Sequence, residues 1–343
     1  MVPYMLKAIL AVVLPALLCG SSFAAGALQV QGNQLLAGGR PITLRGVAVG
    51  DPILARQGRP LSDYQRIARD WHANVVRISL HPSVWETTPH AQVLDTLARE
   101  INAALANGMY VILDWHTIGW PDAYYEPIEK DWSDDAPDLY NSKFALACDF
   151  WDAVSARFGK DGRIIFELWN EPVRANNEGD VETPLWSQLK PYYARLLQIV
   201  RAHSTNVVLA TGNEWAYDLR GIRESPLEGQ NIAYCWHIYA NTDDDDELQW
   251  IIHLDALQTI APVMVTEWGF QEKTNENFKG SVQSFGEKFV RDFLEGRHLH
   301  STAWCWHPDW TPVMLKSDWK TPTSMGRFVM RYLAAPQKMA PRM

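Results

Sequence analysis

From residue 42 onward, short apolar runs alternate with longer amphipathic runs. The short runs are rich in Val, Ile and Leu, which is typical of strands buried on both faces of a parallel sheet. They predict strands at 42–49, 74–80, 109–116, 164–172, 206–211, 231–239, 262–269 and 301–307. Apolar residues at helical spacing predict helices at 61–71, 93–107, 142–158, 184–203, 216–222, 246–259, 281–294 and 323–333.

Eight strand–helix units in a chain of 343 residues predict a single-domain (β/α)8 TIM barrel. A doubly wound open sheet is the main alternative. The count of eight favours the barrel, and no Gly-x-Gly-x-x-Gly or Walker pattern follows an early strand. There is no Pro- or Ser-rich linker and no repeat, so we expect residues 28–343 to form one catalytic domain.

Residues 1–27 have the pattern of a secretory signal peptide. Lys7 precedes an apolar stretch at 8–18, and small residues follow around Ala24. A lipid anchor at Cys19 is disfavoured, because Leu18 is larger than the residue that usually precedes a lipidated cysteine. We therefore expect a secreted or periplasmic protein that has no membrane association once the signal is cleaved.

The net charge of −9 argues against nucleic acid or another polyanion as a partner. The 16 tryptophans are more than a core usually needs, and they suit a cleft for sugars, whose apolar C–H faces pack on indole rings. The cysteines that remain after signal cleavage, Cys148, Cys235 and Cys305, lie in apolar or aromatic runs and are expected to be buried thiols. We expect a monomer.

Two of the predicted strands end in a glutamate beside a tryptophan. The strand at 164–172 ends in Trp169-Asn170-Glu171-Pro172, and Pro172 has no N–H to continue a sheet ladder. The strand at 262–269 ends in Glu267-Trp268-Gly269. In a parallel barrel, both glutamates lie at the face where catalytic groups gather, as a two-carboxylate mechanism requires.

Other polar and aromatic side chains follow the remaining strands, and barrel closure brings them to the same face. Each alone is most often structural, so it is their convergence that indicates a site. They are Arg77, Asp114, His116, Asn213, Glu214, His237, Tyr239, Trp304, Trp306 and His307.

The motifs around the two glutamates resemble those of glycoside hydrolase family 5. The segments 168–172 and 265–269 match its acid/base and nucleophile motifs, and the resemblance runs from about Leu44 to the last helix. It implies that Arg77, His116, His237, Tyr239 and Trp304 surround the first sugar subsite, with Trp306 an alternative match to Trp304.

The chemistry expected of these residues is retaining hydrolysis. Glu267 would attack the anomeric carbon, and Glu171 would protonate the leaving oxygen and later activate water. The charge of Glu267 would raise the pKa of Glu171. Arg77 and Tyr239 would bond the nucleophile and keep it ionised, and Asn170 would bond the sugar 2-OH. His116 and His237 would bond substrate hydroxyls or Glu171, and Trp304 would form the floor of the −1 sugar subsite.

Four further tryptophans and one further glutamate could either contact substrate or serve the packing of the fold. Glu214 follows a strand and an asparagine, as Glu171 does, but we interpret it as a substrate-binding or structural residue. Four tryptophans are either sugar platforms or packing residues: Trp120, Trp132, Trp215 and Trp310.

Other classes of protein are less consistent with the sequence. His116 and His237 stand alone along the chain and not in a His-x-His pair, which disfavours a metal-dependent hydrolase, and there is no Gly-x-Ser-x-Gly elbow for a serine hydrolase. A non-catalytic sugar-binding barrel is disfavoured because both glutamates and their supporting Arg and Tyr are present. We expect neither a metal nor another cofactor.

The substrate is expected to be a neutral β-linked polysaccharide or oligosaccharide. The resemblance to family 5 makes endo-acting hydrolysis of β-1,4-glucan of the cellulose type the first choice. β-Mannan is the main alternative, followed by xyloglucan or mixed-linkage glucan, and endo and exo action both remain open.

Overall fold

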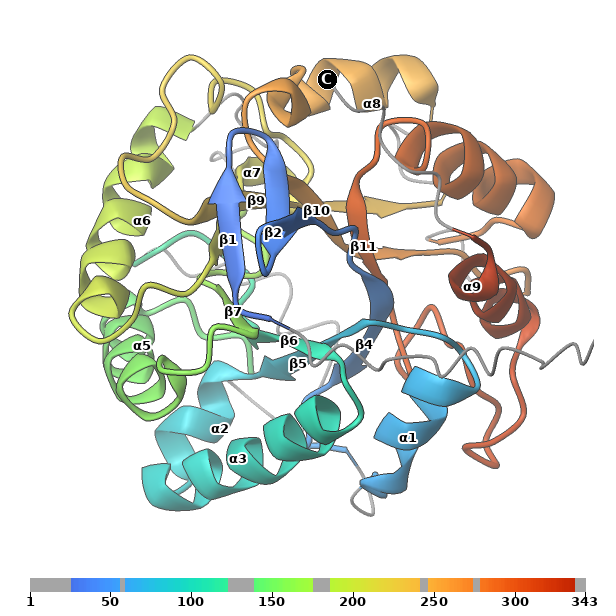
Figure 1. Cartoon of the computed structure of the whole chain (residues 1–343), viewed down its shortest axis with the longest axis horizontal. Coiled ribbons are helices and arrows are strands. Elements are labelled where there is room, and N and C mark those ends of the chain that lie inside the picture. Colours follow the sequence, from blue (N-terminus) through green and yellow to red (C-terminus); the bar gives the residue numbers. More distant parts are fainter. Residues whose placement is uncertain are drawn as a thin grey trace, which may run out of the picture.

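The computed structural model describes residues 26–55, 59–122, 139–174, 186–240, 246–273 and 278–336. Most of the proposed signal segment, and Trp132, lie outside these ranges. The described chain forms a closed barrel of parallel strands surrounded by helices, as predicted (Figure 1). The strands are β4 (Arg45–Gly50), β5 (Val75–Leu80), β6 (Tyr110–Trp115), β7 (Ile164–Glu167), β8 (Val208–Ala210), β9 (Ile232–Tyr239), β10 (Val263–Gly269) and β11 (His300–Ala303).

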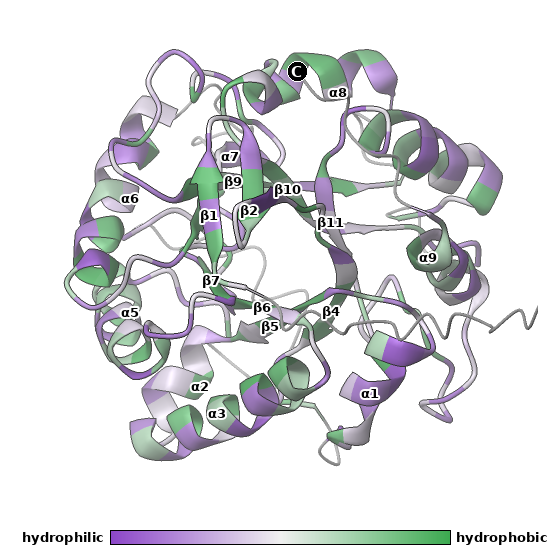
Figure 2. Ribbon diagram, in the orientation of Figure 1, coloured by the Kyte–Doolittle hydropathy of each residue, from purple (hydrophilic) through white to green (hydrophobic). Residues whose placement is uncertain are grey.

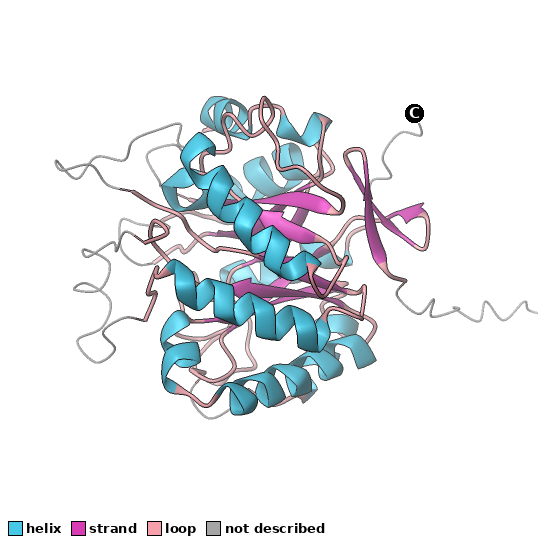
Figure 3. Ribbon diagram, turned by 90° about the vertical axis from the view of Figure 1, so that its left-hand side faces the viewer, coloured by secondary structure: helices cyan, strands magenta, loops and turns pink. Residues whose placement is uncertain are grey.

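The barrel closes where β11 pairs in parallel with β4, through Ser301 and Arg45, Thr302 and Gly46, and Ala303 and Val47. Helices lie outside the strands (Figure 3). They are α1 (Ser62–Arg69), α2 (Pro82–Thr87), α3 (His90–Ala106), α5 (Phe144–Phe158), α6 (Trp186–Arg201), α7 (Asn213–Ala216), α8 (Glu247–Leu254), a 3₁₀ turn (Leu257–Thr259), a π-helix (Val282–Leu294) and α9 (Ser324–Ala334).

Alternate strand residues belong to two separate apolar cores. Ile112 and Ile165 pack in one cluster, while their neighbours Val111 and Phe166 pack in the larger cluster that includes the helix residues. Each strand is therefore apolar on both faces, which explains the continuous apolar runs in the sequence. Figure 2 shows green, hydrophobic residues along several barrel strands, and helices on which hydrophobic and hydrophilic residues alternate.

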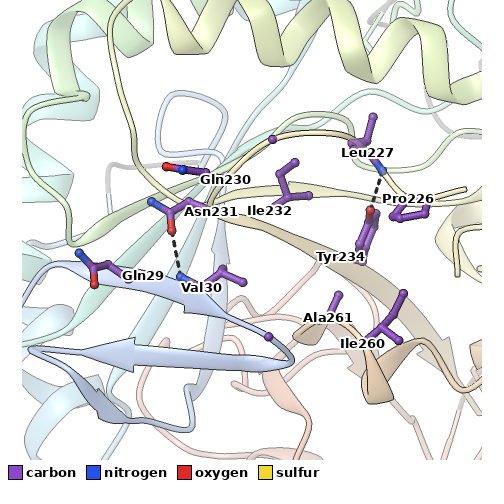
Figure 4. Close-up of a pocket in the computed structure, with 12 residues that line it drawn as sticks. Gln29, Val30, Pro226, Leu227, Gln230, Asn231, Ile232, Tyr234, Ile260 and Ala261 are labelled. Carbon is purple, nitrogen blue, oxygen red and sulfur yellow. Dashed lines mark hydrogen bonds between the residues drawn. The ribbon is translucent and has the colours of Figure 1, made fainter.

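A small antiparallel sheet at the N-terminus was not predicted. Its strands are β1 (Leu28–Gln31), β2 (Gln34–Ala37) and β3 (Arg40–Pro41), and it lies at one end of the barrel (Figure 3). Leu28 and Leu35 pack into the same cluster as Ile112, so the sheet covers the N-terminal end of the barrel. A hollow of about 540 Å³ lies beside it, lined partly by Asn231, whose side chain accepts a hydrogen bond from the Val30 backbone (Figure 4).

Two predicted helices were wrong in their bounds. The helix at 216–222 is absent, and α7 (Asn213–Ala216) precedes that position instead, with Glu214 and Trp215 in the left-handed region. The chain turns back there, because the Asp218 amide bonds the Asn213 carbonyl at 3.0 Å. The helix at 246–259 is interrupted, because Asp255 and Ala256 have left-handed backbones that end α8.

Other differences concern element ends. The helix α2 was missed, although Pro82 at its first position is a recognised start signal. The strand expected to reach residue 172 ends at Glu167, and the strand expected to reach 307 ends at Ala303. The residues after these two strands lie beyond the regular ladder, although single backbone bonds to neighbouring strands, such as the Asn170 amide to the Trp115 carbonyl and the Trp304 amide to the Trp268 carbonyl, still hold them at the barrel mouth.

Cys235 and Cys305 are buried free thiols, as predicted, whereas Cys148 is also free but only half-buried. Among the described helices, none combines the length and the apolar character needed to cross a bilayer.

Candidate active site

Glu171 and Glu267 face each other at the C-terminal end of the barrel. Glu267 lies on β10, and Glu171 follows β7 on the loop that begins with Leu168. A carboxylate oxygen of each glutamate and a ring nitrogen of His237 all lie within 4.8 Å of one another. The structure therefore brings together the two carboxylates that the sequence singled out, although about 100 residues separate them along the chain.

Arg77 holds the Glu267 carboxylate from below. Its Nη1 lies 2.6 Å from Oε1 of Glu267, while Nε and Nη2 bond the two oxygens of Glu167 at 2.7 and 3.0 Å. Nη2 also lies 2.9 Å from Oδ2 of Asp114. The guanidinium is fully buried, and its bonds to three carboxylates offset the free-energy cost of removing its charge from water.

Tyr239 holds the other oxygen of Glu267. Its hydroxyl donates to Oε2 at 2.5 Å. Burial and the nearby charge of Glu267 raise the pKa of Tyr239 well above its usual value, so the phenol stays neutral and remains a donor. Two donors on different strands therefore fix the orientation of the Glu267 carboxylate.

Glu171 has a different environment from Glu267. Burial and then the charge of Glu267 raise its pKa, although the hydrogen bond from His237 opposes the rise. Its side chain is 12% exposed, and its Oε1 lies 2.9 Å from Nδ1 of His237. The environments of the two carboxylates thus favour a proton on the Glu171 side of the site, as an acid/base group requires.

Asn170 is fixed with its amide nitrogen unused. Its Oδ1 accepts from Nη2 of Arg77 at 2.7 Å. Its Nδ2 is buried and has no partner among the described residues. An unpaired buried donor is costly, so this nitrogen is suited to a hydroxyl of a bound molecule.

Trp304, and not Trp306, lies against the site. The Trp304 ring is parallel to that of His116, with 5.2 Å between centroids, and His116 Nδ1 bonds Asp114 at 2.7 Å. The Trp306 ring is fully buried, donates to Asp63 at 3.0 Å and packs edge-on to Trp71. These contacts favour Trp304 over Trp306 as the tryptophan that faces the site.

A family model described as Cellulase (glycosyl hydrolase family 5) matches residues 35–309. The chain belongs to glycosyl hydrolase family 5. Endoglucanase A of Evansella cellulosilytica is 27% identical over 68% of this chain and 43% of its own length, and cellulase CelDZ1 of Thermoanaerobacterium sp is 25% identical over 81% and 69%. The chain thus spans roughly half the length of several curated relatives that it matches.

Solved structures share the fold of this family 5 chain. The β-glucanase SdGluc5_26A of Saccharophagus degradans, crystallised in complex with cellotetraose, has a TM-score of 0.79 at 24% identity, covering 94% of this chain and 97% of that one. The catalytic domain of Thermobifida fusca endoglucanase Cel5A has a TM-score of 0.72 at 22% identity, covering 91% and 98%.

Two residues that contact Arg77 and His237 in this site were missed in the sequence. Glu167 bonds Arg77, and Thr266 bonds both Glu167 and His237. Asp114 was noted at a strand end, but its bonds to Arg77 and His116 were not foreseen. Glu167 was nevertheless detectable, because it is the single charged residue of an apolar strand. It also lies two residues after the inward-facing Ile165, so its side chain points to the same face of the strand.

The remaining candidate residues divide between the site and the packing around it. Glu214 lies 4.0 Å from Nδ1 of His253, in a group with Asp218 that is separate from the two facing glutamates. Trp120 is buried and packs in the core. Trp215 and Trp310 are half-buried: Trp215 donates its amide to the Pro172 carbonyl at 3.2 Å, and Trp310 lies parallel to Trp304.

Among the residues that the structure describes, two groups of side chains have the composition of a metal site. The first group consists of Glu171, His237 and Glu267. In it, the Arg77 guanidinium already bonds the Glu267 carboxylate. In the second, both oxygens of Asp218 bond Arg220, at 2.6 and 3.0 Å. A cation at either place would have to displace or face an arginine, so neither group is suited to a resident metal.

Proposed function

We propose that this chain is a retaining endo-acting β-glycosidase that hydrolyses β-1,4-glucan of the cellulose type. The observation that carries the proposal is the close approach of the Glu171 and Glu267 carboxylates, within 4.8 Å. Retaining glycosidases separate their two carboxyl groups by about 5–5.5 Å, and inverting enzymes by about 6.5–9.5 Å to admit a water.

In the first step, Glu267 attacks the anomeric carbon while Glu171 gives its proton to the leaving oxygen. Arg77 and Tyr239 hold Glu267 ionised and aligned for the attack. The product is a glycosyl ester on Glu267. The unused Nδ2 of Asn170 would bond the sugar 2-OH, a contact that strengthens in the transition state.

In the second step, water hydrolyses the ester. Esterification removes the charge of Glu267, and with it one cause of the raised pKa of Glu171. Glu171 is then a better base, and it takes a proton from the attacking water. The second displacement restores the original configuration at the anomeric carbon and returns both glutamates to their starting states.

A glucan substrate is supported by three observations. The relatives are named endoglucanases and cellulases, and the SdGluc5_26A structure contains cellotetraose. In this chain, Trp304 lies parallel to His116 and packs in a cluster with Tyr239, whose hydroxyl bonds Glu267. The net charge of −9 also favours a neutral chain over an acidic polysaccharide.

The deciding experiment is reducing-sugar release from carboxymethylcellulose, mixed-linkage glucan and galactomannan, with Glu267→Gln as the inactive control. Release from the glucans that disappears in the variant is the expected result. Release from galactomannan alone would contradict the glucan assignment and make the chain a mannanase. The absence of release from all three would contradict the glucanase proposal and favour a sugar-binding barrel.

We also propose that the protein acts outside the cytoplasm, as a monomer, after residues 1–27 have been removed. The support for export is the sequence pattern of that segment alone. N-terminal sequencing of the protein from culture medium and from the periplasm should give a chain that starts near residue 25 or 28. A full-length chain confined to the cytoplasm would contradict export.

A further inference from the structure

His237 has hydrogen-bond partners on both ring nitrogens. Its Nδ1 lies 2.9 Å from Oε1 of Glu171, and its Nε2 lies 3.0 Å from Oγ1 of Thr266. The ring is buried, so these two partners, and not bulk water, decide which nitrogen carries a proton. The state of His237 therefore bears directly on the protonation of Glu171.

The direction of the Thr266 hydrogen bonds follows from Glu167. The Thr266 hydroxyl donates to Oε1 of Glu167 at 2.9 Å. Burial would raise the pKa of Glu167, but the Arg77 guanidinium and the contact with His237 lower it to about 2, so Glu167 is an acceptor only. A hydroxyl has one hydrogen to donate, so Oγ1 of Thr266 is left to accept from Nε2–H of His237.

We propose that Thr266 and Glu167 keep a proton on Nε2 of His237, so that the acidic proton of the site is shared between Nδ1 of His237 and Glu171. The inference rests on the acid/base role proposed above for Glu171. Thr266 and Glu167 are then positioning residues, because they act through His237. Both are fully buried beneath the two facing glutamates.

The proton balance of this arrangement is simple. One proton occupies the Glu171–His237 pair, either on the Glu171 carboxyl or on Nδ1. In the first chemical step it leaves through Glu171 to the glycosidic oxygen as the C–O bond breaks. In the second step the attacking water returns one proton to the pair, and Nε2 keeps its own proton throughout.

The surroundings of His237 favour the protonated pair. Burial alone would lower the pKa of the ring, but the charge of Glu267 and the contacts with Glu167 and Glu171 raise it to about 10. Oε2 of Glu267 and Oε1 of Glu167 each lie 3.8 Å from a ring nitrogen. The charged and titratable groups around the ring are Glu167, Glu171, Glu267, Tyr239, Arg77 and His116.

The pair therefore titrates as a unit and holds its proton to higher pH than an isolated glutamate would. Removing the acceptor for Nε2–H should lower the pH at which the Glu171–His237 pair loses its proton. Thr266→Val is close in size to the natural residue and deletes that acceptor, whereas Thr266→Ser retains it.

The test compares the pH dependence of kcat/KM for the natural enzyme, Thr266→Val and Thr266→Ser on a soluble β-glucan. We expect the basic limb of the Val variant to move to lower pH by about half a unit or more, the size expected for one lost hydrogen bond. The basic limb of the Ser variant should lie at the same pH as that of the natural enzyme. A folded Val variant with an unmoved basic limb would overturn the proposal.

A second measurement does not depend on turnover or on the variant folding. Nitrogen-15 NMR of the His237 ring in the natural protein should show a protonated Nε2 across the neutral range, with Nδ1 changing at basic pH. An unprotonated Nε2 would overturn the proposal even in an active enzyme. If the protein hydrolyses no glycan, the proposed function fails, but the NMR result still decides the hydrogen-bond direction.

Discussion

The Tyr239 hydroxyl donates a hydrogen bond to Oε2 of Glu267 over 2.5 Å, from the strand next to that of the glutamate. Because Arg77 holds the other oxygen, the carboxylate has little freedom to rotate. This pairing of two donors on one carboxylate supports the assignment of Glu267 as nucleophile, since a nucleophile must be ionised and aligned when the sugar arrives.

Tyr239→Phe should lower kcat/KM by about 10- to 100-fold, because a hydrogen bond to a charged group is worth about 1.5–3 kcal/mol. The fold should persist, since the ring is retained. Kinetics on a soluble glucan would measure the loss, with Tyr192→Phe on α6 as a control that also deletes one phenol hydroxyl. Equal rates in Tyr239→Phe and the natural enzyme would contradict the supporting role.

Glu171→Ala should lose most activity on natural glucans, whose leaving groups need a proton. Added azide should restore turnover of an activated aryl β-glycoside, because the small anion occupies the space of the missing carboxylate and attacks the glycosyl ester. Formation of a β-glycosyl azide, detected by mass spectrometry, is the measurement. Glu214→Ala is the matched control, since Glu214 also follows a strand and an asparagine but lies with His253, and azide should have no effect there.

His300 should make the folded protein less stable in mild acid. Burial lowers its pKa from 6.5 to about 4, and Nδ1 accepts from the Leu44 amide at 3.0 Å. As the pH falls from 6.5 to 4, the unfolded chain binds a proton at this histidine while the folded protein does not. The free energy of unfolding should therefore fall with pH, by roughly 3 kcal/mol for this group.

Urea titrations at pH 7 and pH 4.5 would measure that dependence in the natural protein and in His300→Gln. The variant keeps an acceptor near Leu44 but does not titrate, so its loss of stability between the two pH values should be smaller. His72→Asn, at an exposed position, should leave the dependence as it is. An unchanged dependence in His300→Gln would show that other groups cause it.

Gly50→Ala should disturb the barrel mouth through Trp310. Gly50 has a φ of +69°, and a Cβ there would lie 1.9 Å from Cζ3 of Trp310. The alanine would strain the backbone and displace the indole from its stacking on His307, whose centroid is 4.2 Å away. We expect a lower melting temperature and a higher KM for long glucan oligosaccharides.

Gly108→Ala is the matched control for the backbone effect, because Gly108 also has a positive φ, of +79°, but its Cβ would meet nothing within 4 Å. That variant should lower the melting temperature without raising KM. A similar KM in both variants would indicate that Trp310 does not contact substrate.

The repeated strand–helix pattern and the two motifs that end in Glu171 and Glu267 were sufficient to predict the barrel and its face. This worked because strands that are apolar on both sides must be covered by helices, and because parallel strands all end on the same side. The short N-terminal sheet escaped prediction, since strands of two to four residues carry too little periodicity. The left-handed turn at Glu214 escaped as well, because none of its left-handed residues, Glu214, Trp215 and Ala216, is a glycine or an asparagine.

The sequence by itself determined the barrel, the end of the barrel at which polar side chains gather and the identity of the two facing glutamates, since local pattern and strand-end motifs are properties of nearby residues. Only the tertiary structure decided which groups meet beneath them. Arg77 joins Glu167, Asp114 and Glu267 from four strands, and Thr266 links Glu167 to His237. Such contacts depend on the register of strands closed into a ring, which brings together side chains as much as 190 residues apart along the chain.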